Sequence, residues 1–402
     1  MKRFFVPYKH RCTCLFFALM CCLVACGGTS DGTSSSSAPA ARSGTSMTGA
    51  GSAGAVTTPP PGVHLGAQPC PEAVSETSHW DPIIGTQSGV DAVGRVICAS
   101  LTNTTSLQAL VVVFYEGTGH TADVYVFNTI TNPSPTQIFK LQNLYKGDAR
   151  ISAYNTLLTS EVDQGSSLNL NKPNDALQQD LFREFKWSDG TGTLVPVSFP
   201  GIFPNLTRYE AESDQQKVNQ GQMSWELNAT AMADRLVAKL LNWSPTAPAT
   251  IVSGGKQHDK DAIVAVKNTS AGGGAINIAM SRLEGNSNNG IWEATAAASD
   301  GLSITAPESR DRLNGTTTVT GTGNALAGKT GKVRVLDHLY TDIGNADVKS
   351  TSSSGNTTFS TNVSYTSSFK GGSQEGLVVL YSYSNGSDAI SGAVILKELL
   401  SA

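Results

Sequence analysis

The sequence has few charged residues, no basic excess and no apolar run long enough to span a membrane, which takes about 20 apolar residues. Charged residues are 15% of the 402, far fewer than a coiled coil needs. The first 26 residues hold four basic residues and no acid, so 24 basic and 32 acidic residues follow them. An acidic chain without a basic stripe does not suit nucleic acid, and we expect no nucleic-acid partner.

Common signatures of metal and catalytic sites are also missing. The histidines have no zinc-ligand spacing, and no Cys-x-x-Cys follows residue 26. Acidic clusters near Asp163 and Asp337 lack the spacing of a calcium loop and are typical of Asx turns. We therefore assign no catalytic residue, no cofactor and no metal ligand from the sequence.

The first 26 residues have the plan of an export signal, with basic residues up to Arg11 and an apolar core after them. The core ends in Leu23-Val24-Ala25-Cys26, which resembles the bacterial lipobox at all four positions. The resemblance implies cleavage before Cys26 and a diacylglyceryl (lipoprotein) modification of its thiol. Several acyl chains would then anchor the protein on the outer face of the bacterial cytoplasmic membrane. The alternative is an ordinary signal peptide that contains a cysteine.

Two cysteines remain after the lipobox, Cys70 and Cys98. In an oxidising compartment such a pair favours a disulfide, which would close a loop of about 28 residues. Two separate buried thiols are the alternative.

Composition divides the chain into a signal peptide (1–25), a tether (26–65), an α+β body (66–300) and a β-sandwich (301–402). Between residues 27 and 62, 32 of 36 positions are Gly, Ser, Thr, Ala or Pro, which cannot bury enough apolar surface to fold. A further boundary is predicted near residue 250. The fold class is therefore mainly β and multi-domain.

The α+β body shows antiparallel strands and about two helices. Runs at 109–115 and 121–127 predict a pair of strands, and Asp189-Gly190 between 181–187 and 194–199 predicts a hairpin. Thr207-x-x-Glu210 predicts a helix to about Asn219, and a second helix is expected from Asn228 to before Pro245. The acids of the first helix are interpreted as a solvated surface. Strands within 251–299 are interpreted as completing the sheet of this body.

Short strands at even spacing follow residue 301, with no helical pattern among them. Ser303-Ile-Thr-Ala-Pro307, Val319-Thr-Gly-Thr-Gly323 and Gly331-Lys-Val-Arg-Val-Leu-Asp337 resemble the immunoglobulin-like domain of bacterial spore-germination proteins. The resemblance covers about a quarter of the chain and implies a β-sandwich without catalytic residues. Leu339 to Asn356 is longer than in that family.

One segment matches a nucleotide-binding pattern by its letters alone. Gly323 to Thr330 fits the phosphate loop, but that loop must open a helix. An alternating strand pattern follows here instead. We expect a turn and no nucleotide.

These patterns predict a lipid-anchored, non-enzymatic binding or scaffold module of the cell envelope, with a link to sporulation or germination implied only by the resemblance. The membrane is reached through Cys26, and the partner is another envelope protein or the cell wall. The insertion with Tyr340, Asp342 and Asp347 is the expected contact loop. A solute-binding lipoprotein and a hydrolase directed at wall polysaccharide are the alternatives; the hydrolase would need paired carboxylates in a cleft.

Overall fold

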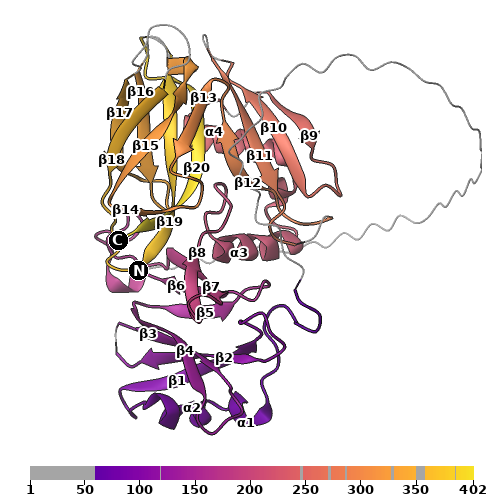
Figure 1. Ribbon diagram of the computed structural model, residues 1–402, viewed down its shortest axis with the longest axis vertical. Coiled ribbons are helices and arrows are strands. Elements are labelled where there is room, and N and C mark those ends of the chain that lie inside the picture. Colours follow the sequence, from indigo (N-terminus) through magenta and orange to yellow (C-terminus); the bar gives the residue numbers. More distant parts are fainter. Residues whose placement is uncertain are drawn as a thin grey trace, which may run out of the picture. The chain divides into compact units, whose positions relative to one another are not determined.

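The computed structural model describes residues 59–402, except residues 118, 245–247, 270–272, 286–287, 327–329, 350–357 and 385. It is mainly β, with antiparallel sheets, a few helices and a β-sandwich, as predicted (Figure 1). Cys26 with its lipobox and most of the tether lie outside the described residues.

The first sheet is an antiparallel meander. Its strands are β1 (Asp91–Ala99), β2 (Gln108–Tyr115), β3 (Ala122–Asn128) and β4 (Thr136–Leu144). The strand pair predicted at 109–115 and 121–127 is confirmed as β2 and β3. Strand β2 is apolar on both faces because both faces of the sheet are covered.

Two short helices cover one face of this sheet, α1 (Glu72–Ser75) and α2 (Thr77–Ile84), neither of which was predicted. Val74 and Trp80 from the helices pack against Val111 and Val113 of β2. The structure joins Cys70 and Cys98 in a disulfide, which ties the segment before α1 to the end of β1.

The second sheet covers the opposite face. Its strands are β5 (Asp148–Ile151), β6 (Leu157–Glu161), β7 (Leu181–Ser188) and β8 (Thr193–Val197), and a short 3-10 turn, η1 (Asn174–Ala176), precedes β7. Leu157 and Phe185 pack against Leu110 and Val112 of the first sheet. The hairpin predicted around Asp189-Gly190 is confirmed as β7–β8.

Helices α3 (Arg208–Asn219) and α4 (Ala229–Leu241) follow, with the 3-10 turn η2 (Ser224–Leu227) between them. Both begin where the capping residues predicted. The Thr207 hydroxyl accepts a hydrogen bond from the backbone N–H of Glu210, and the Asn228 side chain accepts from the N–H groups of Thr230 and Ala231.

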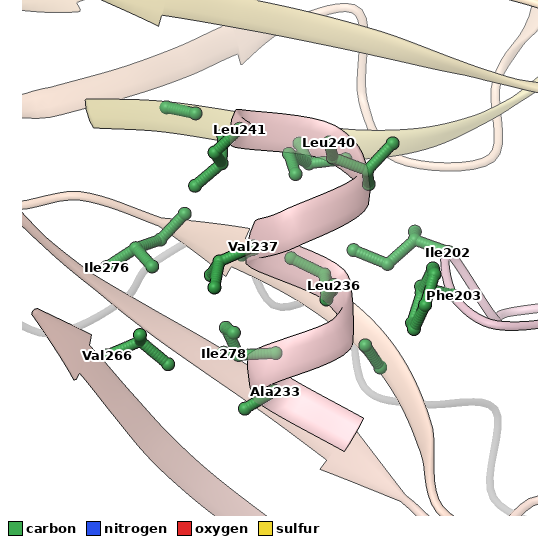
Figure 2. Packing of buried hydrophobic residues seen from close by; sticks show 14 of the residues in the cluster. Ile202, Phe203, Ala233, Leu236, Val237, Leu240, Leu241, Val266, Ile276 and Ile278 are labelled. Carbon is green, nitrogen blue, oxygen red and sulfur yellow. The ribbon is translucent and has the colours of Figure 1, made fainter. Parts of the chain in front are cut away.

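The largest sheet has nine strands. They are β9 (Ala249–Gly254), β10 (Asp261–Lys267), β11 (Ala275–Ser281), β12 (Glu293–Ala298), β14 (Arg312–Asn314), β16 (Thr330–Leu336), β17 (Asp342–Lys349), β19 (Ser373–Tyr383) and β20 (Ile390–Ser401). Helix α4 lies against β10 and β11, with Val237 and Leu241 directed at strand residues such as Ile276 (Figure 2).

A smaller sheet covers the other side of the C-terminal strands. It consists of β13 (Leu302–Ala306), β15 (Thr316–Gly323) and β18 (Thr358–Ser364), and the 3-10 turn η3 (Asn324–Leu326) follows β15. Alternate residues of β19 face the two sides: Val378 and Leu380 join the sandwich core, and Leu377 and Val379 join the core under α4. Strands β19 and β20 are therefore buried on both faces.

The nine-stranded sheet crosses the boundary predicted at residue 300. Ala297 and Ala298 of β12 pair with Ile395 and Val394 of β20. The strands within 251–299 were expected to complete the sheet of the preceding body, and this is wrong, because β20 supplies the edge to which they are joined. A shared sheet, rather than a linker, connects the α+β part to the sandwich.

The described part of the predicted contact loop is not an exposed loop, so this prediction is wrong there. Asp342–Lys349 form strand β17, paired with β16, while residues 350–356 lie outside the described residues. Tyr340 is half-buried, and its hydroxyl donates to the carbonyl oxygens of Ile202 (3.1 Å) and Pro204 (3.0 Å). Asp342 and Asp347 pair with Arg334 and Lys332 on β16, each at 3.5 Å.

The segment from Gly323 to Thr330 joins two strands. Gly323 ends β15 and Thr330 begins β16. The strand expected after this segment is confirmed. A phosphate loop needs a helix at that position.

Candidate functional site

An open groove of about 870 Å³ runs along the outer face of α4. The inner face of the helix carries its apolar residues into the core (Figure 2). The opposite stripe has helical i, i+3, i+4, i+7, i+8 spacing and is Ala231, Asp234, Arg235, Ala238 and Lys239. The two alanines leave the space that makes the helix face hollow.

Two aromatic residues complete the groove. Trp225 comes from η2, and Phe203 comes from the loop of residues 201–206, called here the 201–206 loop. Backbone hydrogen bonds fix this loop to β12: the N–H of Ile202 donates to Ala294 O (2.7 Å), and the N–H of Ala294 donates to Phe203 O (2.8 Å).

The charged groups of the groove are of both signs. The Arg235 guanidinium lies 4.0 Å from the centre of the Trp225 ring, and the Lys239 ammonium lies 5.6 Å from that of Tyr340. Asp234 Oδ1 is buried without a hydrogen-bond partner among the described residues. Burial raises the pKa of Asp234. A ligand that donates a hydrogen bond to this oxygen would offset the free-energy cost of burying it without a partner.

Buried carboxyl groups lie close to the groove walls. Glu226 follows Trp225 in the chain, and its side chain is fully buried, with both oxygens unpartnered in the described structure. Burial, with a smaller contribution from Asp214, raises the pKa of Glu226 to about 7. Glu293 accepts a hydrogen bond from Asn205 Nδ2 at 3.0 Å, and burial raises its pKa well above the ordinary value.

A buried lysine lies on the inner side of the 201–206 loop. Lys397 is 0% exposed, donates to Leu206 O, and lies 3.4 Å from Glu375. Glu375 also accepts hydrogen bonds from Ser198 Oγ (2.7 Å) and the Phe199 N–H (2.8 Å). Burial lowers the pKa of Lys397, although Glu375 opposes the effect.

A second buried network surrounds the first turn of α3. Arg208 donates to Glu184 (2.7 Å) and to Glu284 (2.5 Å), and its guanidinium lies over the Tyr154 ring. Burial opposes the charge of Arg208, but Glu184 and Glu284 outweigh it and raise its pKa. Burial raises the pKa of Glu284 to about 8 although Arg208 opposes it.

The acids of α3 are not a solvated surface, and that prediction is wrong. Asp214 is buried and pairs with Lys217 at 2.7 Å. Glu212 pairs with Arg150 at 3.4 Å and accepts from the Ala153 N–H. The sequence does not reveal this, because the residues that cover the helix come from distant segments.

The predicted Asx turns are present. Asp163 Oδ1 accepts from the N–H of Gly165, and Asp337 Oδ1 accepts from those of Leu339 and Thr341. Across the described ranges, no three His, Cys, Asp or Glu side chains are grouped as metal ligands would be.

The arrangement suits binding better than acid–base chemistry. A glycosidase pair needs two carboxyl groups that reach one substrate. Asp234 is the one acid among the residues that line the groove, while Glu226 and Glu293 are 0% exposed. An apolar groove with aromatic walls and a few polar groups is the usual form of a ligand site.

Sequence reasoning missed most of this site. The sequence patterns singled out none of Phe203, Trp225, Asp234 and Arg235. The alternation of alanine with charged residues opposite the apolar stripe of α4 was the available signal. No sequence pattern indicated Phe203, because its position depends on backbone contacts with the distant strand β12.

No protein-family model and no curated protein matches this chain. Of the helices that the structure describes, none has the length and apolar character needed to cross a membrane.

Proposed function

We propose that this protein is a lipid-anchored, non-enzymatic binding module of the bacterial envelope, which holds a segment of a partner protein in the α4 groove. The groove carries the proposal. Trp and Arg are the residues that most often dominate binding energy at protein interfaces, and here Trp225 and Arg235 lie together on an open concave surface.

The charges favour a peptide segment over a neutral sugar. Arg235 covers a face of Trp225 at 4.0 Å, and this face is then not free for a sugar ring. Asp234 can accept hydrogen bonds from peptide N–H groups, and Arg235 and Lys239 can donate to peptide carbonyl oxygens. All three can also pair with charged side chains.

Site-specific photocrosslinking in cells tests the groove. A photoreactive residue at Ala238 is compared with one at Leu170, which is 58% exposed and is not among the residues that line the groove. We expect a discrete protein adduct from position 238 alone, and its loss with Arg235→Glu, a change on the exposed rim. The same adduct from both positions, or one that survives Arg235→Glu, would contradict the proposal.

Acyl labelling tests the anchor separately. The wild type is expected to incorporate a radiolabelled or clickable fatty acid, and Cys26→Ala is not. Equal labelling of both proteins would contradict the proposed lipid anchor and would not bear on the proposed binding in the groove.

The solute-binding alternative has its own readout. A panel of small molecules is added to the Cys26→Ala protein, and its Tm is measured. A ligand-dependent rise that Trp225→Ala abolishes would favour capture of a solute over capture of a partner protein.

A further inference from the structure

The three charged residues that line the α4 groove are Asp234, Arg235 and Lys239, and they differ in how they are partnered. Arg235 lies over the ring of Trp225, and Lys239 lies over that of Tyr340. Asp234 has no such contact: its Oδ1 is buried, and no donor of the described chain reaches it. A buried carboxylate oxygen without a donor costs free energy, so the groove carries one unmet electrostatic need.

Helix α4 itself supplies no cation to Asp234. Side chains on one helix meet at spacings of three and four residues, and the four residues at those spacings from Asp234 carry no charge: Thr230, Ala231, Val237 and Ala238. The Thr230 hydroxyl donates to Asn228 Oδ1 at 2.8 Å and is therefore already used. The two alanines line the groove beside Asp234 and are too short to cover its carboxyl group.

The neighbouring cation of the groove is matched to a different acid. Burial raises the pKa of Glu226, and Arg235 is among the charges that oppose this rise. For Asp234, burial is the one cause of the raised pKa, and no cation opposes it. Arg235 is therefore stacked on Trp225 and balanced by Glu226, while the charge of Asp234 is left without a counterpart.

We propose that Asp234 binds a lysine or arginine side chain of the partner segment, and that this contact selects the segments that the groove accepts. The inference rests on the proposed function of the groove. The cationic head donates a charge-assisted hydrogen bond to the carboxylate, and its aliphatic stem lies along Ala231 and Ala238. A segment with an acid at this position is rejected, because two carboxylates would be brought together away from water.

A long cationic side chain suits the site better than other donors. A neutral donor makes a hydrogen bond to Asp234 but leaves its charge without a counterpart. A calcium or magnesium ion needs several oxygen ligands, and Asp234 is the one acid among the residues that line the groove. The remaining lining is largely apolar, with Phe203 and Trp225 beside the two alanines, and it favours the methylene groups of a lysine or arginine stem.

Selection from a peptide library tests the specificity. Short random peptides displayed on phage are selected on the full chain carrying Cys26→Ala, and peptides that also bind the Trp225→Ala protein are discarded. We expect the remaining peptides to share a Lys or Arg position. Selection on Asp234→Lys should replace this position by Asp or Glu. Asp388→Lys makes the same change of charge at an exposed residue outside the groove and should leave the selected peptides unchanged.

A selected peptide then gives the size of the effect. Asp234→Asn keeps the shape of the side chain and removes its charge, so it should raise the Kd of the peptide by about tenfold, measured by calorimetry. The same change should not lower the Tm of the free protein, because it removes a carboxylate whose burial is unfavourable. Weaker binding without a lower Tm shows that recognition is lost while the fold is kept.

The outcomes separate this inference from the proposed function. Peptides that depend on Trp225 but share no basic position would overturn the role of Asp234 and leave the groove as a binding site. The same peptides selected on Asp234→Lys, or an unchanged Kd with Asp234→Asn, would overturn it equally. A selection that yields no peptide dependent on Trp225 would count against both proposals.

Discussion

The core of the C-terminal sandwich and the region around the 201–206 loop and the first turn of α3 (residues 207–210) are both buried, but different residues fill them. The sandwich core is built on aliphatic side chains such as Val378, Leu380 and Leu396. The loop region contains Arg208, Glu293 and Lys397 with their partners. In an aliphatic core, the loss of unfolding free energy grows with the side-chain volume that a substitution removes. In a buried charge network, removing one partner leaves the other charge buried without compensation.

The largest effect is expected from breaking a charge network near the loop. Arg208→Met leaves Glu184 and Glu284 buried without their cation. The free energy of unfolding should fall by about 3–5 kcal/mol, measured by urea denaturation. Adding Glu184→Gln and Glu284→Gln replaces the two carboxyl groups that lost their partner and should recover part of the loss. No recovery would mean that Arg208 acts through packing alone.

A truncation in the sandwich core gives the matched comparison. Leu380→Ala should lower the free energy of unfolding by about 2–4 kcal/mol, because a fully buried side chain is shortened. The loss should be the same at pH 5 and pH 8, since no titrating group is removed. A loss that differs between the two pH values would contradict the contrast between the regions.

The pH dependence should come from the buried acids. The raised pKa means that folded Glu226 keeps a proton that the unfolded chain releases above its ordinary value of 4.5. Its contribution is therefore fully present below about pH 4.5 and is lost as the pH rises through 7, with a slope of at most about 1.4 kcal/mol per pH unit. Glu226→Gln should flatten the curve of unfolding free energy in this window. An unchanged curve would show that Glu226 is ionised in the fold.

The smallest effect is expected at the contact between the two regions. Tyr340 lies after β16 of the sandwich, and its hydroxyl donates to carbonyl oxygens of the 201–206 loop. Tyr340→Phe should cost about 1 kcal/mol, seen as a small fall in Tm. It should also speed amide hydrogen exchange at residues 202–206, and Tyr365→Phe, whose hydroxyl donates to Leu313 O instead, should not.

The contrast also separates what the sequence could and could not predict. Strands of the sandwich, the β7–β8 hairpin, the starts of α3 and α4, and the Cys70–Cys98 disulfide all followed from local signals or from pairing within a short stretch. The sheet that joins β12 to β20 did not, because each strand is compatible with several neighbours.

The candidate site was beyond local patterns for the same reason. Glu226 and Glu293 have unremarkable neighbours in the sequence, and their burial arises when η2, β12 and the 201–206 loop meet. The same holds for Lys397, which reads as the polar end of an apolar strand. Periodicity indicates which face of one element is buried, but it cannot indicate which distant charge will cover it.

The position of β20 within the nine-stranded sheet has a consequence for the order of folding. Residues 390–401 pair with β12, β14 and β19, yet they are synthesised about a hundred residues after β12. Until they emerge, the edges of β12 and β19 that pair with β20 are free, and free strand edges promote wrong pairing between chains. The nine-stranded sheet therefore cannot be completed until the last residues of the chain are synthesised, and its rate of assembly should be governed by this distant pairing. A chaperone that shields exposed strand edges would act on this sheet at the edge of β12 that later pairs with β20.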